Sequence, residues 1–154
     1  MEFSIKSIGK IETPHNDRKT APIQPAFTDA FGTVIVDQNY QEGLKDLEGF
    51  SHIILLYKFH KAKKEKLSVK PYLEKEEKGI FAIRHEERPN NIGLSVVQLV
   101  RVEENKILVK GIDVLNGTPL LDIKPFVPKF DCKEIESCRI GWLENKIEEN
   151  QIEE

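Results

Sequence analysis

Residues 95–109 read SVVQLVRVEENKILV, and they are the best guide to the architecture of this chain. Two runs rich in β-branched residues, Val100–Val102 and Ile107–Val109, flank the polar segment Glu103–Lys106. β-Branched side chains suit the pleated surface of a sheet, and a short polar segment between two such runs is typical of a hairpin tip. The stretch therefore predicts an antiparallel β-hairpin.

Further clusters of β-branched and aromatic residues, separated by turn residues, occur through the first 128 positions. With the hairpin they give these candidate strands: Phe3–Ile11, Thr33–Asp37, His52–Phe59, Gly79–Arg84, Ser95–Val102 and Ile107–Val114. Many short strands with no long helix between them predict an all-β fold with minor helices. We expect a small, closed or nearly closed β-barrel and not a doubly wound Rossmann sheet.

The candidate strand over His52–Phe59 shows the alternation of a sheet most plainly. Ile53, Leu55, Tyr57 and Phe59 point to one side of it. Because successive side chains of a strand point to opposite faces, we expect these four residues to face the core.

The remaining segments predict loops and short helices. Pro14–Gly32 holds three prolines and little periodicity, which indicates a loop, and Gly43–Glu48 favours a short helical turn. Pro125 and Pro128 lack amide donors, so they argue against a central strand around them. In Ile135–Glu154, apolar residues at roughly helical spacing among acids predict a C-terminal amphipathic helix.

Length and charge restrict the function classes. At 154 residues we expect one domain, and the formal net charge of -3 gives no general attraction to nucleic acid, so a polyanion site must be a local patch. Cys132 and Cys138 match neither a metal motif nor a disulfide framework. We interpret them as reduced thiols of a cytoplasmic protein, without a leader or a membrane span.

The segment from Arg84 to Asn90 is the first candidate site. Arg84 ends an apolar run, and Arg88-Pro89-Asn90 follows within a turn. A guanidinium binds carboxylate or phosphate through paired hydrogen bonds, and an asparagine amide offers both a donor and an acceptor. The group therefore fits a nucleotide-like ligand. From spacing alone, an equally good alternative is that both arginines pair with the abundant surface acids.

Other candidate residues are less specific. Asp113 and Asp122 lie beside turns, where they can accept hydrogen bonds from ribose, an amine or an arginine, or merely satisfy backbone donors. His60 lies at a strand end, with no second ligand at metal spacing, so we expect no metal. The only basic cluster can contact phosphate or form a solvated loop, and it comprises Lys61, Lys63, Lys64 and Lys66. The sequence has no glycine-rich phosphate loop and no GxSxG or HExxH motif.

Several runs together resemble the TrmO/TsaA-like family, also called YaeB-like. The resemblance covers about residues 5–131, and its motifs are Ile8–Pro14, Pro22–Gln24, Gly49–His52, Gly79–Ser95 and Asp113–Pro128. Members include tRNA methyltransferases that use S-adenosyl-L-methionine to methylate N6 of threonylcarbamoyladenosine 37. The resemblance thus implies a barrel domain over residues 1–131, and the apolar spacing predicts a helical tail over residues 132–154.

The resemblance also implies a methyl-donor site without a Rossmann sheet, in a homodimer with the donor near the subunit interface. The implied donor-binding residues are Pro22, Gln24, Phe59, His60, Lys61, Arg84, Leu94, Gly111, Ile112 and Asp113. Arg88 and Asn90 match the Arg-Pro-Asn turn of the family, which implies a catalytic role for them. The implied substrate is tRNA, with neither a metal nor a membrane involved.

The chain departs from the family pattern at three positions. Ile23 stands where the family commonly has arginine, Ile83 where it has threonine, and Asn91 where it prefers proline. Loss of a cation at Ile23 keeps a second hypothesis open, a module that binds or senses S-adenosyl-L-methionine without methylating anything. A third is a methyltransferase that acts on another RNA or on a small molecule.

Overall fold

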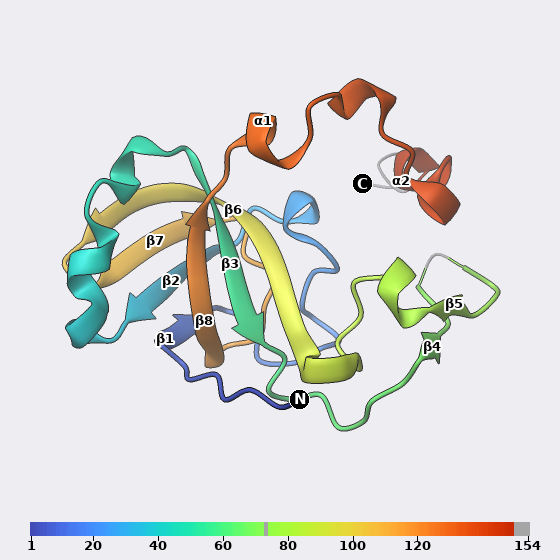
Figure 1. Ribbon diagram of the computed structural model, residues 1–154, viewed down its shortest axis with the longest axis horizontal. Helices are drawn as coiled ribbons and strands as arrows, with labels where there is room; N and C mark the ends of the chain where they lie inside the picture. The colour runs from blue at the N-terminus through green and yellow to red at the C-terminus, as the bar shows by residue number, and fades with distance from the viewer. Residues whose placement is uncertain (73, 150–154) are drawn as a thin grey trace.

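The computed structural model describes residues 1–72 and 74–149, and its main feature is a closed antiparallel barrel (Figure 1). The strand order around the barrel is β1-β2-β7-β6-β3-β8. The bounds are β1 Gly9–Glu12, β2 Phe31–Val36, β3 His52–Lys58, β6 Ile92–Glu103, β7 Lys106–Lys110 and β8 Thr118–Pro125. A separate two-stranded sheet pairs β4 (Ser68–Val69) with β5 (Lys78–Gly79). The prediction of an all-β barrel is confirmed.

Short helical turns connect the strands. The 3-10 helices are η1 Pro25–Phe27, η2 Gln38–Leu44, η3 Leu47–Gly49, η4 Ile80–Ala82, η5 Pro89–Asn91, η6 Ile135–Ser137 and η7 Gly141–Leu143, and the α-helices are α1 Pro128–Asp131 and α2 Lys146–Glu149. The helical turn expected near Gly43–Glu48 is confirmed by η2 and η3. No helix within the described ranges has the length and apolar character needed to cross a membrane.

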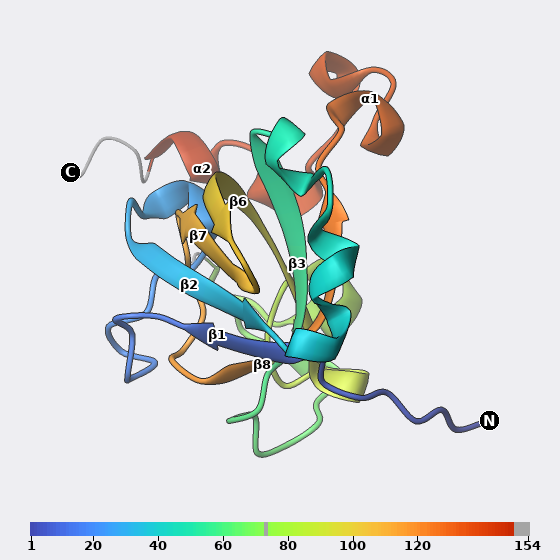
Figure 2. The ribbon, with the colours of Figure 1, turned by 90° about the vertical axis from the view of Figure 1, so that its left-hand side faces the viewer.

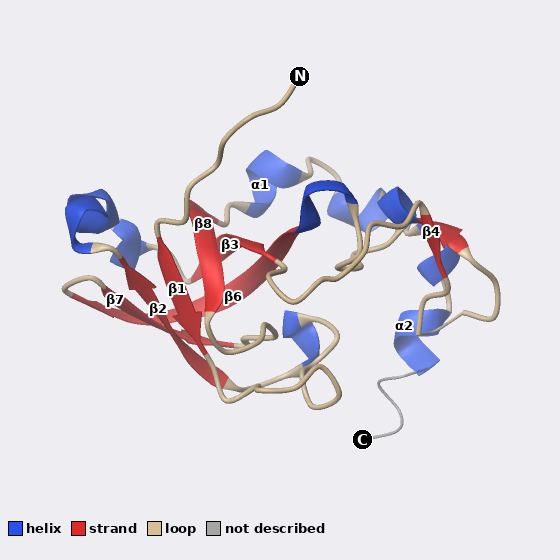
Figure 3. Cartoon of the chain, turned by 90° about the horizontal axis from the view of Figure 1, so that it is seen from below, coloured by secondary structure: helices blue, strands red, loops and turns tan. Residues whose placement is uncertain are grey.

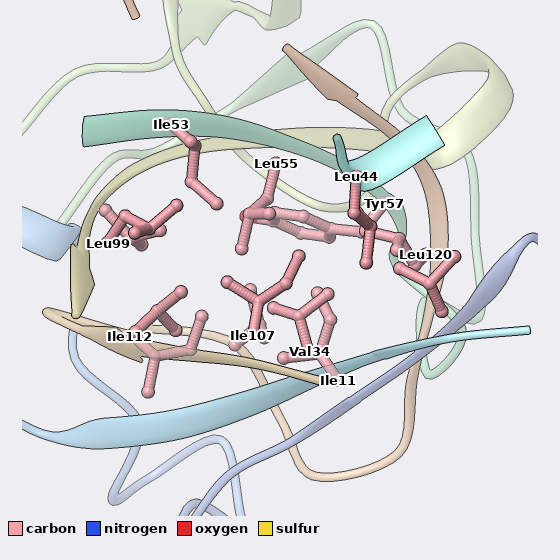
Figure 4. Packing of buried hydrophobic residues seen from close by; sticks show 14 residues of the cluster. Ile11, Val34, Leu44, Ile53, Leu55, Tyr57, Leu99, Ile107, Ile112 and Leu120 are labelled. Atoms are coloured by element: carbon pink, nitrogen blue, oxygen red, sulfur yellow. The ribbon is translucent and has the colours of Figure 1, made fainter. Parts of the chain in front are cut away.

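Apolar side chains fill the barrel interior (Figure 4). Along β3, Ile53 and Leu55 are fully buried and Tyr57 nearly so, while the side chains between them are more exposed, as the alternation predicts. Ile11, Val34 and Ile107 meet them from the other side of the barrel. Burial of such side chains contributes roughly 1.5–3 kcal/mol each and is the main stabilisation of the closed sheet.

The predicted hairpin is β6–β7, and its tip is tighter than expected. Val102 pairs with Ile107 and Glu103 with Lys106, so the turn consists of Glu104 and Asn105 alone. Glu104 adopts a positive φ of 53°, and the Asn105 amide donates to the Val36 carbonyl at 2.7 Å. The hairpin tip is thereby fastened to the end of β2 (Figure 2).

Three expected strands differ from the structure. The strand expected over Ile107–Val114 ends at Lys110, because Gly111 turns the chain with a positive φ of 84°. The strand expected over Phe3–Ile11 begins only at Gly9, because its partner β2 ends at Val36, directly opposite Gly9. The strand expected over Gly79–Arg84 is the short β5 followed by the turn η4, which buries Ile80. The expected loop over Pro14–Gly32 is confirmed, with η1 and the first residues of β2 at its end.

The expectation that prolines exclude a central strand before Pro128 was wrong. β8 lies between β1 and β3 in the closed sheet. Pro119 is the second residue of β8 and Pro125 its last, so both prolines lie near strand ends, where a missing amide donor costs little. Pro128 begins α1, where its fixed φ suits the first turn.

The single amphipathic helix expected over Ile135–Glu154 was also wrong within the described residues. Three short pieces, η6, η7 and α2, occupy residues 135–149, and residues 150–154 lie outside the described range. Gly141 and Asn145 have positive φ values of 60° and 66°, which interrupt a right-handed helix. This segment returns to the β4–β5 side of the molecule (Figure 3), where Trp142 Nε1 donates to the Ala82 carbonyl at 2.8 Å.

Candidate functional site

A cavity of about 530 Å³ opens at one end of the barrel. Its walls come from the loop before β2, the end of β3, the turn between β5 and β6, the start of β6 and the segment between β7 and β8. The volume lies in the usual range for small-molecule sites. Most of the predicted site residues line it, namely Pro22, Gln24, Phe59, His60, Lys61, Arg84, Arg88, Leu94 and Asp113.

One wall of the cavity is aromatic. The rings of Tyr57 and Phe59 meet edge to face, with centroids 5.4 Å apart. They lie against Gly93, where an added Cβ would be 2.2 Å from Cε2 of Tyr57 and 2.9 Å from Cζ of Phe59. Tyr57 pairs with Gly93 in the sheet, so the absence of a side chain at this position makes room for both rings.

A buried chain of hydrogen bonds lies behind this wall. Ser95 Oγ donates to Asp113 Oδ1 at 2.6 Å, and the Tyr57 hydroxyl lies 2.9 Å from Ser95 Oγ. Burial raises the pKa of Asp113 to about 6, although the Ser95 hydrogen bond and the positive charge of Arg84 oppose that rise. Burial also raises the pKa of Tyr57, and the negative charge of Asp113 adds to this effect. Tyr57 therefore remains a protonated phenol.

Gly111 and Ile112 do not line the cavity, although the resemblance implied donor contacts for them. Gly111 has a φ of 84°, which favours glycine, and its amide donates to Ala30 O at 2.8 Å. Ile112 is fully buried, and its carbonyl lies 2.9 Å from Nε2 of His15. Both residues thus support the backbone that presents Asp113. His15 was missed because nothing in its loop sequence indicates a partner so far along the chain.

Residues 84–91, called the arginine turn below, are held in place by hydrogen bonds from their own side chains. Arg88 Nη1 donates to the Ile83 carbonyl at 2.7 Å, and the Asn91 side-chain amide donates to the Glu86 carbonyl at 2.9 Å. Asn90 has a φ of 65° and lies beside the cavity rather than in its wall. Its carbonyl accepts a 2.9 Å hydrogen bond from Nζ of Lys58.

The acids of this turn are paired with cations of neighbouring loops. Arg18 forms an ion pair with Glu86, and Lys66 with Glu87 at 2.6 Å. The Lys66 hydrogen bond lowers the pKa of Glu87. Within the described residues, no ion pair joins Arg84 or Arg88 to a carboxylate, so the alternative that both pair with surface acids does not hold there. Arg84 Nη1 instead lies 3.4 Å from Oε1 of Gln24.

Of the other candidates from the sequence, His60 lies in the cavity wall and Asp122 lies outside it. Burial lowers the pKa of His60 in the cavity wall, with a smaller contribution from the charge of Lys61. Asp122 is not in the wall; it pairs with Lys124 Nζ at 2.7 Å and accepts from the Ile123 amide. In the part of the chain that the structure describes, no cluster of three or more His, Cys, Asp or Glu residues suits a metal ion.

The geometry can hold a ligand with both apolar and charged parts. The aromatic wall offers a face for a planar ring or a cationic centre, Asp113 offers an acceptor for N–H or O–H groups, and Arg84 offers donors for a carboxylate. Arg18 lies at the same cavity and donates to the Lys61 carbonyl, joining two of the surrounding loops. These features suit a nucleoside joined to an amino acid.

Comparison with known proteins gives the same family from sequence and from structure. A family described as the tRNA-methyltransferase O N-terminal domain matches residues 10–132. A "probable S-adenosyl-L-methionine-binding protein" of Pyrococcus abyssi is 51% identical over 143 residues, which are 92% of this chain and 77% of that protein. A human tRNA (adenine(37)-N6)-methyltransferase is 33% identical over 132 residues, covering 80% of this chain and 30% of the human protein.

The crystal structure of TrmO from Pseudomonas aeruginosa superposes with a TM-score of 0.77 at 38% identity. The match covers 92% of this chain and 62% of that one, so the chain spans less than two thirds of the solved protein's length.

Proposed function

The chain belongs to the family of tRNA-methyltransferase O N-terminal domains, and from that premise we propose that it is a tRNA methyltransferase that uses S-adenosyl-L-methionine. The acceptor in this proposal is N6 of adenosine 37, in its threonylcarbamoyl form. One observation carries the proposal: a single cavity gathers an aromatic wall, a half-buried carboxylate and an arginine without an acidic ion-pair partner among the described residues.

This donor fits the residues of the cavity. Asp113 accepts from an amine or a hydroxyl group of the donor, and Arg84 binds its carboxylate. Phe59, supported by the buried ring of Tyr57, packs against the adenine or the cationic sulfur. The remaining proposed donor contacts are Pro22, Gln24, His60, Lys61 and Leu94 in the wall, with Gly111 and Ile112 supporting Asp113 from behind.

The donor supplies a methyl group that the positive sulfur has already activated. Transfer breaks the carbon–sulfur bond, which leaves a neutral thioether, forms a carbon–nitrogen bond at N6 and releases the single N6 proton to water. The main task of the protein is therefore orientation, an effect worth roughly 7–11 kcal/mol in intramolecular models. Arg88 holds the turn that carries Arg84, and Asn90, beside the cavity, orients the acceptor base.

The proposal includes a homodimer with the donor near the subunit interface. Apolar side chains at the cavity support it: Ile23 is 55% exposed, and Ile92 and Leu94 are 37% and 39% exposed. A second subunit would cover these residues and exclude water from the donor. The tRNA substrate implies a cytoplasmic site of action.

A donor-binding module without methyltransferase activity is the second candidate. It is favoured by Ile23, an exposed apolar residue in the cavity wall where the family commonly has arginine. The Pyrococcus abyssi relative is named for donor binding alone. A methyltransferase for another RNA or a small molecule is the remaining alternative.

Two measurements test the proposal. Calorimetry with S-adenosyl-L-methionine should detect binding, and Arg84→Ala should weaken it about tenfold, as expected for loss of a charge-assisted hydrogen bond. Arg101→Ala is the matched control, because Arg101 is exposed on β6 and pairs with Glu103 at 2.8 Å, away from the cavity. No binding at high micromolar donor would exclude both the enzyme and the donor-binding module.

Activity separates these two candidates. The protein is incubated with donor and with tRNA that carries or lacks threonylcarbamoyladenosine 37, and the nucleosides are analysed by mass spectrometry. A methyl group on N6 of the modified nucleoside supports the proposed enzyme. Donor binding without methylation of either tRNA supports the module instead.

A further inference from the structure

The hydroxyl groups of Ser95 and Tyr57 are buried polar groups that the proposed reaction has not used. Ser95 is fully buried on β6, and Tyr57 is 3% exposed on β3. Buried hydroxyl groups need partners, and here each provides one for the other while Ser95 also reaches Asp113. Gly93 makes this possible, because the Tyr57 ring lies across it and brings the phenol to Ser95, two residues along the same face.

The chain of hydrogen bonds has one direction when Asp113 is ionised. A carboxylate can only accept, so the single proton of the Ser95 hydroxyl goes to Asp113 Oδ1. The proton between Tyr57 and Ser95 must then come from the phenol, whose raised pKa keeps it protonated. Tyr57 therefore donates to Ser95, and Ser95 donates to Asp113.

Resting on the proposed function, we propose that Ser95 and Tyr57 are positioning residues of the donor site: Ser95 engages Oδ1 of Asp113 directly and Tyr57 acts through Ser95, so that the other carboxylate oxygen serves the methyl donor. Neither residue needs to contact the reacting atoms. They fix the rotamer of the carboxylate from behind and keep it in the ionised, accepting form.

The electrostatics of the site explain why this support is needed. Burial raises the pKa of Asp113 to about 6, close to physiological pH, and three groups oppose this rise: Ser95, the backbone amide of Asp113 itself and Arg84. From β6, Ser95 stabilises the carboxylate by its hydrogen bond, and from the arginine turn Arg84 does so by its charge. From β3, the neutral Tyr57 acts through Ser95. Without Ser95, a larger fraction of Asp113 is protonated at neutral pH and loses acceptor capacity.

The test is donor affinity as a function of pH, measured by calorimetry with S-adenosyl-L-methionine on the full chain between pH 5 and 8. Ser95→Ala should weaken binding about tenfold at pH 7 and move the fall in affinity to higher pH than in the unmodified protein. Tyr57→Phe preserves the ring and should shift the profile in the same direction by a smaller amount. Ser95→Thr, which keeps a hydroxyl, should restore much of the affinity.

Two controls make the result specific. Asp113→Asn should remove this component of the pH dependence, because an amide does not titrate in this range. Ser7→Ala removes an exposed hydroxyl that bonds to the Gly9 carbonyl outside the cavity wall, and it should leave the profile unchanged. Circular dichroism verifies the fold of each variant, and Tyr57→Phe replaces Ser95→Ala as the deciding variant should the latter not fold.

The outcomes distinguish this inference from the proposed function. If the unmodified protein binds the donor and both variants bind it with the same pH profile, the positioning role is wrong and the donor site stands. Equal weakening at every pH assigns the hydroxyls a purely structural role and also overturns the inference. If the unmodified protein binds no donor, the proposed function fails and the positioning role fails with it.

Discussion

The guanidinium of Arg88 donates a hydrogen bond of 2.7 Å to the carbonyl oxygen of Ile83, the residue immediately before Arg84. This bond closes the turn between η4 and η5 across five residues of chain. Arg88 therefore helps to set where the backbone of Arg84 lies, even though both side chains also line the cavity.

Arg88→Ala should consequently lower donor affinity for two reasons. It removes the hydrogen bond that closes the turn, and it removes a positive charge from the cavity wall. Loss of the bond leaves the Ile83 carbonyl without this partner, and we expect about 1 kcal/mol lower stability together with several-fold weaker binding. Arg88→Lys keeps the charge but cannot reproduce the planar guanidinium fork, so it should recover only part of the affinity. Urea unfolding and calorimetry measure the two effects, and full recovery by lysine would contradict the role of the bond.

Gly93→Ala should damage both the barrel and the site. An added Cβ would lie 2.2 Å from the ring of Tyr57 and 2.9 Å from that of Phe59, so both rings must move. Overpacking of this kind costs about 1–3 kcal/mol and should sharply weaken donor binding. Gly49→Ala is the control, since nothing lies within 4 Å of its added Cβ, and equal stability losses in thermal unfolding of the two variants would refute the steric argument.

Asp113→Asn should stabilise the ligand-free protein at neutral pH while weakening donor binding. Burial raises the folded-state pKa of Asp113 from 3.8 to about 6. The protonated carboxyl therefore contributes fully to the free energy of unfolding below pH 4, and this contribution is lost as the pH rises through about 6. The variant does not ionise there. Its advantage in free energy of unfolding should therefore grow between pH 4 and pH 6 and reach about 1–3 kcal/mol at pH 7.

Urea unfolding of both proteins at pH 4.5 and pH 7 measures this difference. A stability difference that does not change with pH would show that ionisation of Asp113 carries no energetic cost in the folded state.

Trp142→Phe should loosen the C-terminal segment without affecting the barrel. The indole Nε1 is bonded to the Ala82 carbonyl at 2.8 Å, and phenylalanine cannot donate. We expect faster hydrogen exchange of amides in residues 141–146 and a stability loss of about 1 kcal/mol or less. Tyr72→Phe removes a highly exposed hydroxyl and is the control; equal exchange in both variants would contradict a role for the indole bond.

The parts of the fold that follow from alternation could be predicted from the sequence. The β6–β7 hairpin and the buried side of β3 were correct because each depends on neighbouring residues. β8 was missed because prolines near strand ends look, in sequence, like prolines that break a strand. The C-terminal helix was overpredicted because apolar spacing does not reveal the positive φ values of Gly141 and Asn145.

The candidate site was also predicted only in part, because local sequence indicated some of its residues and not others. Arg84, Arg88 and Asp113 were found from turn residues and family motifs, and the structure brings them to one cavity, whereas Asn90 does not line it. Ser95 and His15 were missed because their partners lie far along the chain. A weak signal existed for Ser95, which occupies a core-facing position of β6 between Gly93 and Val97. Only the packing of β3 against β6 reveals what it contacts.

The cavity can form only after the barrel has closed. β1 needs β8 as its second neighbour, and Gly9 pairs with Leu120, so strands from the two ends of the domain must meet before the sheet is continuous. Thr118, the first residue of β8, lines the cavity with Asp113. A chain still emerging from the ribosome, with β8 not yet made, has neither a closed barrel nor a complete cavity. Only the complete domain is therefore expected to bind the donor, and translation products that end before β8 are not.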